Sequence, residues 1–154
     1  FPTRRSSDLK QVIHDIGVGC LLHDIGLRYT TLDYEGKSME DMNPEALAEY
    51  KKHPVYGYTS VKDEEWISDE VKKIILYHHE RLDGTGYPFG KTAAELNTQE
   101  RMMACIDIYQ ALTESRPYKQ GMSHEKACEI LWDMAKKGWL DEAIVKQVED
   151  CFRG

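Results

Sequence analysis

The chain has 154 residues, four cysteines and a formal net charge of −7 at pH 7. This length allows one domain with a sizeable core, and the negative charge argues against a broad surface for a nucleic-acid polymer. No apolar run approaches the roughly 20 residues that a membrane span needs, and no segment resembles a signal peptide. The composition therefore favours a cytoplasmic protein, or a cytoplasmic domain of a larger one.

The four cysteines are far apart and lie among apolar residues of expected helices, which indicates small buried residues of a reducing compartment rather than disulfides or zinc ligands. They are Cys20, Cys105, Cys128 and Cys151.

Residues 1–8 (FPTRRSSD) have no helical periodicity and do not join naturally to the periodic segment after them. We interpret them as a non-native or disordered leader and expect the folded domain to cover residues 9–154.

Residues 9–26 are predicted to form one helix, in which Gly17 and Gly19 permit close packing. His23 continues an apolar stripe of this helix, and Asp24 follows it directly. A buried Asp needs a partner, and a bound cation would supply one, although a locally bonded core histidine is the alternative for the pair alone. A second His-Asp pair, at residues 14–15, should face the opposite side of the helix and be solvated.

Two further segments end in histidine. Asn43 and Pro44 are typical of a helix start, and the run after them ends at His53, where the next proline breaks the helix. His53 is therefore either a helix-end cap or an inward-facing ligand. Ser68 should cap another helix whose apolar positions lead to His78 at its buried end, with His79 one step round.

Residues 80–96 form an irregular, glycine-rich stretch, which we call the GYP loop after its Gly86-Tyr87-Pro88 sequence. A capping box at residues 97–100 should open a helix that carries Asp107 on its apolar face, where a carboxylate needs a cation. Two capped helices that complete the chain, from Ser123 and Asp141, are expected to be scaffold.

The candidate ligands are imidazoles and carboxylates without a thiolate. This set suits iron, manganese, nickel or zinc and argues against a structural zinc site. The members are His23, Asp24, His53, His78, His79 and Asp107.

In order and spacing, these motifs resemble the HD-GYP family, a branch of the HD superfamily of metal-dependent phosphohydrolases, from about Leu9 to the end of the chain. The resemblance implies an all-α, HD-domain-like helical bundle with an irregular GYP loop. It also implies that residues 9–154 lack upstream helices, at least one of which supplies metal ligands in the family, and a regulatory N-terminal domain.

The resemblance further implies hydrolysis of cyclic di-GMP to pGpG, to GMP or to both, with two or three divalent ions, Fe or Mn first, bound by the six residues above. His23 and Asp24 would also act in catalysis, and diguanylate cyclase (GGDEF) domains are possible partners. The substrate-binding residues that it implies are Arg116, Lys119, Asp83, Gly86, Tyr87 and Pro88. The alternative for Arg116 and Lys119 is a pair of ordinary surface cations.

Two positions depart from the family pattern, which usually has lysine where Leu27 stands and aspartate where Gln110 stands. A second hypothesis is therefore a sensor or docking module that binds cyclic di-GMP or a diguanylate cyclase domain without turnover. Retention of every metal-motif residue in the chain favours the enzyme.

Overall fold

Every regular element is a helix in the part of the chain that the computed structural model describes, which is residues 6–31, 39–115 and 119–152. Apart from helices, these residues include an isolated bridge between Asp83 and Thr92. The expected all-α fold is confirmed. The elements are α1 (Ser6–Leu22), the 3₁₀ helices η1 (Ile25–Tyr29) and η2 (Met39–Asp41), α2 (Pro44–Tyr50), α3 (His53–Val61), α4 (Asp69–Tyr77), α5 (Thr98–Thr113), α6 (His124–Lys136) and α7 (Glu142–Cys151).

The helices α2, α4, α5, α6 and α7 begin where the sequence predicts, because side chains satisfy the free backbone N–H groups of their first turns. Asn43 accepts a hydrogen bond from Ala46 N, and Ser68 accepts one from Val71 N. A reciprocal capping box at Asn97 and Glu100 opens α5. The side chains of Ser123 and Asp141 also accept hydrogen bonds from backbone N–H groups at the starts of α6 and α7.

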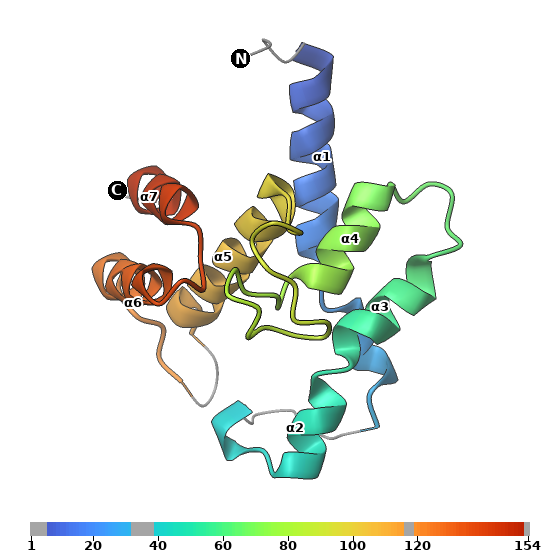
Figure 1. The fold of residues 1–154 in the computed structure, drawn as a ribbon, viewed down its shortest axis with the longest axis horizontal. Helices are drawn as coiled ribbons and strands as arrows, with labels where there is room; N and C mark the ends of the chain where they lie inside the picture. Colours follow the sequence, from blue (N-terminus) through green and yellow to red (C-terminus); the bar gives the residue numbers. More distant parts are fainter. Residues whose placement is uncertain (1–5, 32–38, 116–118, 153–154) are drawn as a thin grey trace.

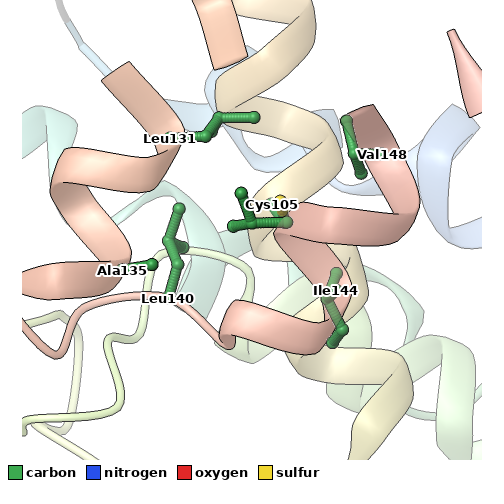
Figure 2. Close-up of a cluster of buried hydrophobic side chains, with 7 residues drawn as sticks. Cys105, Leu131, Ala135, Leu140, Ile144 and Val148 are labelled. Atoms are coloured by element: carbon green, nitrogen blue, oxygen red, sulfur yellow. The ribbon is translucent and has the colours of Figure 1, made fainter. Parts of the chain in front are cut away.

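Helix α5 lies between two groups of helices (Figure 1) and contacts α1 and α4 on one side and α6 and α7 on the other. One apolar cluster joins α5, α6 and α7 around Cys105, Leu131 and Val148 (Figure 2). A second cluster joins α3 and α4 through Val61, Val71 and Ile75 and packs against α1. Asp107, on α5, therefore sits on a helix that packs into the first cluster and that α1 and α4 contact from the other side.

The N-terminal helix differs from the prediction in both bounds. It begins at Ser6, inside the stretch that the sequence suggested to be a leader, and it ends at Leu22 rather than Gly26. Gly19 packs against Ile74, as expected for a glycine at a close contact, whereas the space beside Gly17 is open. The expectation of close packing at Gly17 is wrong.

The expected exposure of Asp15 and the expected burial of two cysteines are also wrong. Asp15 is buried, not solvated, because Ser68 from the start of α4 donates to its carboxylate at 3.0 Å. Cys105 and Cys128 are buried, but Cys20 is half-buried and Cys151, at the end of α7, is exposed. In the described ranges, no helix combines the length and the apolar character needed to cross a membrane.

Candidate metal centre

Three of the candidate histidines are fixed in the same way. Nδ1 of His23 lies 2.8 Å from Cys20 O, Nδ1 of His53 lies 2.7 Å from Tyr50 O, and Nδ1 of His78 lies 2.8 Å from Ile75 O. A carbonyl oxygen can only accept, so each ring carries a proton on Nδ1 and donates it. The lone pair of each neutral ring is then on Nε2, the arrangement typical of histidines that bind metals.

The Nε2 atoms of these rings converge on Asp24. Oδ1 of Asp24 lies 3.2 Å from His53 Nε2 and 3.6 Å from His78 Nε2, and its Oδ2 lies 3.4 Å from His23 Nε2. Nε2 of His53 and Nε2 of His78 are themselves 3.2 Å apart. If both are unprotonated, two lone pairs and a carboxylate face one another, and a cation is what such a set lacks.

Asp107 and His79 extend the cluster on the side of α5. Asp107 Oδ1 lies 3.3 Å from His23 Nε2, and Asp107 Oδ2 lies 3.9 Å from His79 Nδ1. Nε2 of His79 is buried and has no hydrogen-bond partner among the described residues. Ligand atoms of Asp24, His53, His78 and His79 all lie within 4.8 Å of one another, so a single ion could contact them together.

Charge and burial compete at His23 and Asp24. Burial acts to lower the pKa of His23, but hydrogen bonds with Asp107 and Asp24 outweigh it and raise that pKa to about 10. The Asp24 side chain is 47% exposed, so burial raises its pKa only partly, and hydrogen bonds with His23, His53 and His78 hold that pKa far below its usual value. Without a metal, the Asp24 carboxylate is therefore ionised and His23 holds a proton that a metal would displace.

His79 behaves differently. Burial first, and then the neighbouring His78 and His53, lower the pKa of His79 well below that of a free histidine. It therefore remains neutral, which is the state in which imidazole binds a metal.

The short helix η1 explains how His23 and Asp24, which are adjacent in the chain, both reach the cluster. Side chains of neighbouring residues on a helix diverge by about 100°. Because α1 ends at Leu22, His23 and Asp24 lie in a turn before η1 and are free of that restriction. The contact of η1 with α3 brings Gly26 against Gly57 and carries Asp24 to His53.

The GYP loop is held by Glu80, which is only 3% exposed. Its carboxylate accepts hydrogen bonds from Phe89 N at 2.7 Å and Lys91 N at 2.9 Å. Gly86 lies so close to the start of the loop that a β-carbon there would come within 2.4 Å of Arg81 N. The loop is the irregular yellow-green segment in the centre of Figure 1.

This loop places Tyr87 beside the histidines. Tyr87 N donates to His79 O at 3.1 Å, and the two rings stack with centroids 4.7 Å apart. Pro88 follows through a cis peptide bond. Asp83 is exposed, and its carboxylate accepts from both N and Oγ1 of Thr85, which lowers its pKa.

The structure thus brings together all six candidate ligands, with Gly86, Tyr87 and Pro88 adjacent to them on the GYP loop. Their binding roles stay predictions. Lys119 donates to Ala111 O at 3.3 Å, near the end of the helix that carries Asp107, while Arg116 lies outside the described residues. His14 is exposed and contacts Asp15, apart from the cluster, as expected.

Two residues near this centre received no role from the sequence. Glu80 was visible only as a carboxylate at the start of a glycine-rich loop, a signal that could have suggested a loop anchor. Lys51 lies two positions before His53, and its ammonium lies over the Tyr87 ring. No local sequence pattern indicates that contact, because Tyr87 is distant in the chain.

The arrangement places this protein in the class of helical bundles with a His/Asp cluster that could hold a metal ion. Residues 9–144 of the chain match the HD domain family. A Pseudomonas aeruginosa protein named cyclic di-GMP phosphodiesterase is 36% identical over 136 residues, which cover 88% of this chain and 32% of that protein. A Vibrio cholerae protein named 3′3′-cGAMP-specific phosphodiesterase is 33% identical over 132 residues, which cover 80% of this chain and 28% of the relative.

Among solved structures, an HDG"Y"P protein of Bdellovibrio bacteriovorus is similar, with a TM-score of 0.73 and 26% sequence identity over 91% of this chain and 44% of that one. The chain therefore belongs to the HD domain family, and the resemblance to its HD-GYP branch is confirmed. It spans 26 to 32% of the length of the first three curated relatives.

Proposed function

We propose that the chain is the catalytic part of a metal-dependent phosphodiesterase that hydrolyses cyclic di-GMP to pGpG, to GMP or to both. The observation that carries this proposal is the convergence of three Nε2 atoms on the Asp24 carboxylate, which is a donor set for a divalent cation. The names of the curated relatives support the substrate class, since they specify cyclic dinucleotides.

We propose that two divalent ions, Fe or Mn, bind to the six clustered residues, and a third would need further ligands. The orphaned Nε2 of His79 supports metal binding, because a buried acceptor without a partner needs one. When bound, such ions activate water and stabilise charge on a phosphodiester. The proposed ligands are His23, Asp24, His53, His78, His79 and Asp107.

The chain's own residues would hold the substrate against this centre. Lys119 and Arg116 are proposed to contact its phosphates, since charge-assisted hydrogen bonds to phosphate are among the strongest that side chains make. Tyr87 has a buried hydroxyl without a partner in the described ranges and can donate to a substrate oxygen. Gly86 and Pro88 would shape the loop around it, and Asp83 would hold the loop's first turn.

His23 and Asp24 are the proposed catalytic pair. In the described structure, His23 Nε2 is shared between Asp24 and Asp107. As metal ligands, the two residues would hold the ion that activates water beside the reacting phosphate.

The test is to purify the full-length protein anaerobically, load it with Fe(II) or Mn(II), and separate the products formed from cyclic di-GMP and from 3′3′-cGAMP. His53→Ala should lose metal and turnover, whereas His14→Ala, which removes an exposed histidine outside the cluster, should retain both. Metal-loaded wild-type protein that leaves both dinucleotides intact would overturn the proposal.

A module that binds cyclic di-GMP, or a diguanylate cyclase domain, without turnover is the second candidate. The observation that favours it is Leu27, half-buried directly after the His-Asp-Ile-Gly motif, where the family pattern has lysine. Binding of cyclic di-GMP with no product would support this candidate over the enzyme. Under either proposal, the protein would act in the cytoplasm together with an upstream regulatory region.

A further inference from the structure

Lys51 carries a charge that no carboxylate of the described residues neutralises. Within residues 6–31, 39–115 and 119–152, its ammonium has no ion-pair partner, whereas the neighbouring Lys52 pairs with Glu49 at 2.8 Å. Nζ of Lys51 lies instead over the ring of Tyr87, 5.5 Å from its centroid. The exposed Lys51 side chain is thus directed toward the GYP loop.

Tyr87 connects this charge to the candidate metal centre. Its ring stacks on His79 at 4.7 Å, and the His79 ring lies 5.0 Å from that of His53. The Tyr87 hydroxyl is buried and has no hydrogen-bond partner in the described part of the chain. Leaving such a group unsatisfied destabilises the protein, and a polar ligand beside Tyr87 would offset that cost.

The ordinary alternative is that Lys51 only makes a cation–π contact with the Tyr87 ring. That contact accounts for the position of the ammonium over the ring. It does not account for a buried phenol without a partner beside an unpaired cation. Together, an ammonium and a hydroxyl are donors without an acceptor, and an anionic oxygen is the acceptor that suits both.

We propose that Lys51 is a substrate-binding residue whose ammonium contacts a phosphate oxygen of the phosphodiester held at the candidate metal centre, beside the Tyr87 hydroxyl. The inference rests on the proposed function and adds a residue to it. Lys51 follows α2, whereas Lys119 lies by Ala111 in the last turn of α5. The two cations would therefore reach the substrate from different elements.

Lys51→Gln tests the proposal, with Lys52→Gln as the matched control. The two substitutions remove the same charge from adjacent positions, but Lys52 is paired with Glu49. Lys51→Gln should raise KM for cyclic di-GMP at least about tenfold, as expected for loss of one charge-assisted contact, with kcat and metal content nearly unchanged. Lys52→Gln should leave KM unchanged, and Lys51→Arg should recover most of the affinity.

Two further measurements separate this inference from the proposed function. Hydrolysis of bis(p-nitrophenyl) phosphate by metal-loaded wild-type protein reports phosphodiesterase chemistry alone, and calorimetric binding of cyclic di-GMP replaces KM if turnover is absent. Wild-type protein that hydrolyses neither compound would overturn the proposed function. Equal dinucleotide affinities of Lys51→Gln and Lys52→Gln, or a lower kcat with unchanged KM in Lys51→Gln, would overturn the role of Lys51.

Discussion

Gly26 and His53 approach each other so closely that a β-carbon on Gly26 would lie 1.8 Å from the carbonyl oxygen of His53. The same β-carbon would come within 2.5 Å of Gly57 N. Both contacts are with backbone atoms, which cannot move aside as the end of a flexible side chain can. The glycine of the His-Asp-Ile-Gly motif is therefore what allows η1 to rest on α3 and Asp24 to reach His53.

Gly26→Ala should destabilise the protein by about 2–3 kcal/mol and weaken metal binding, because η1 must move away from α3. Gly17→Ala is the control, since nothing lies within 4 Å of its added β-carbon. That change should stabilise α1 by roughly 0.5–1 kcal/mol. Urea denaturation and metal analysis of both variants provide the check, and a Gly26→Ala protein of normal stability and metal content would contradict the prediction.

Metal binding should release protons. In the metal-free protein, Asp107 and Asp24 outweigh burial and raise the pKa of His23 to about 10, so this ring is protonated at neutral pH. A metal that binds Nε2 must displace that proton, so apparent metal affinity should rise with pH below about 10 and fall as the solution is acidified. Calorimetric titration at pH 7 in two buffers of different ionisation enthalpy measures the number released, and an identical heat in both would be the contrary result.

Glu80→Gln should loosen the GYP loop without removing metal ligands. The carboxylate accepts from Phe89 N and Lys91 N, whereas an amide would turn a donor toward one of them. We expect a loss of about 1–3 kcal/mol in stability and weaker substrate binding at normal metal content. Glu95→Gln alters an exposed carboxylate of the same loop and should have little effect on either. Equal behaviour of the two variants in thermal denaturation and substrate binding would show that Glu80 is not the anchor.

Leu27→Lys should raise kcat in the full-length protein while metal content and KM stay nearly constant. Leu27 N bonds to Asp24 O at 3.0 Å, so the new side chain would start next to the candidate centre. A lysine can donate a proton that leucine cannot, and general acid–base help is typically worth roughly 10²- to 10⁴-fold. Arg28→Lys is the control, because it places a lysine at an exposed neighbouring position. A Leu27→Lys protein that gained no activity would mark Leu27 as a packing residue.

The starts of α2, α4, α5, α6 and α7 could be predicted from the sequence because the information is local. An Asn, Ser or Asp before each run, and the Asn97 and Glu100 pair, satisfy backbone groups within three residues. The burial of His78 also agrees with helical periodicity. These features depend on the chain's own neighbours and not on the tertiary structure.

Two of the errors arise from contacts between distant segments. Asp15 is buried because Ser68 covers it, and α1 ends at Leu22 where η1 packs on α3. The position of Lys51 over Tyr87 is of the same kind. None of these leaves a periodic signal in the sequence, because each is set by how two helices or loops meet.

The hydrogen bonds from Nδ1 of three histidines to carbonyls three residues earlier have a consequence for interpreting sequences of this family. Each carbonyl belongs to the last turn of a helix, where backbone oxygens lack partners within the helix. His23, His53 and His78 therefore stabilise the ends of α1, α2 and α4 whether or not a metal is bound. A chain that had lost its catalysis would still benefit from keeping all three, because each of them also satisfies a carbonyl at the end of a helix.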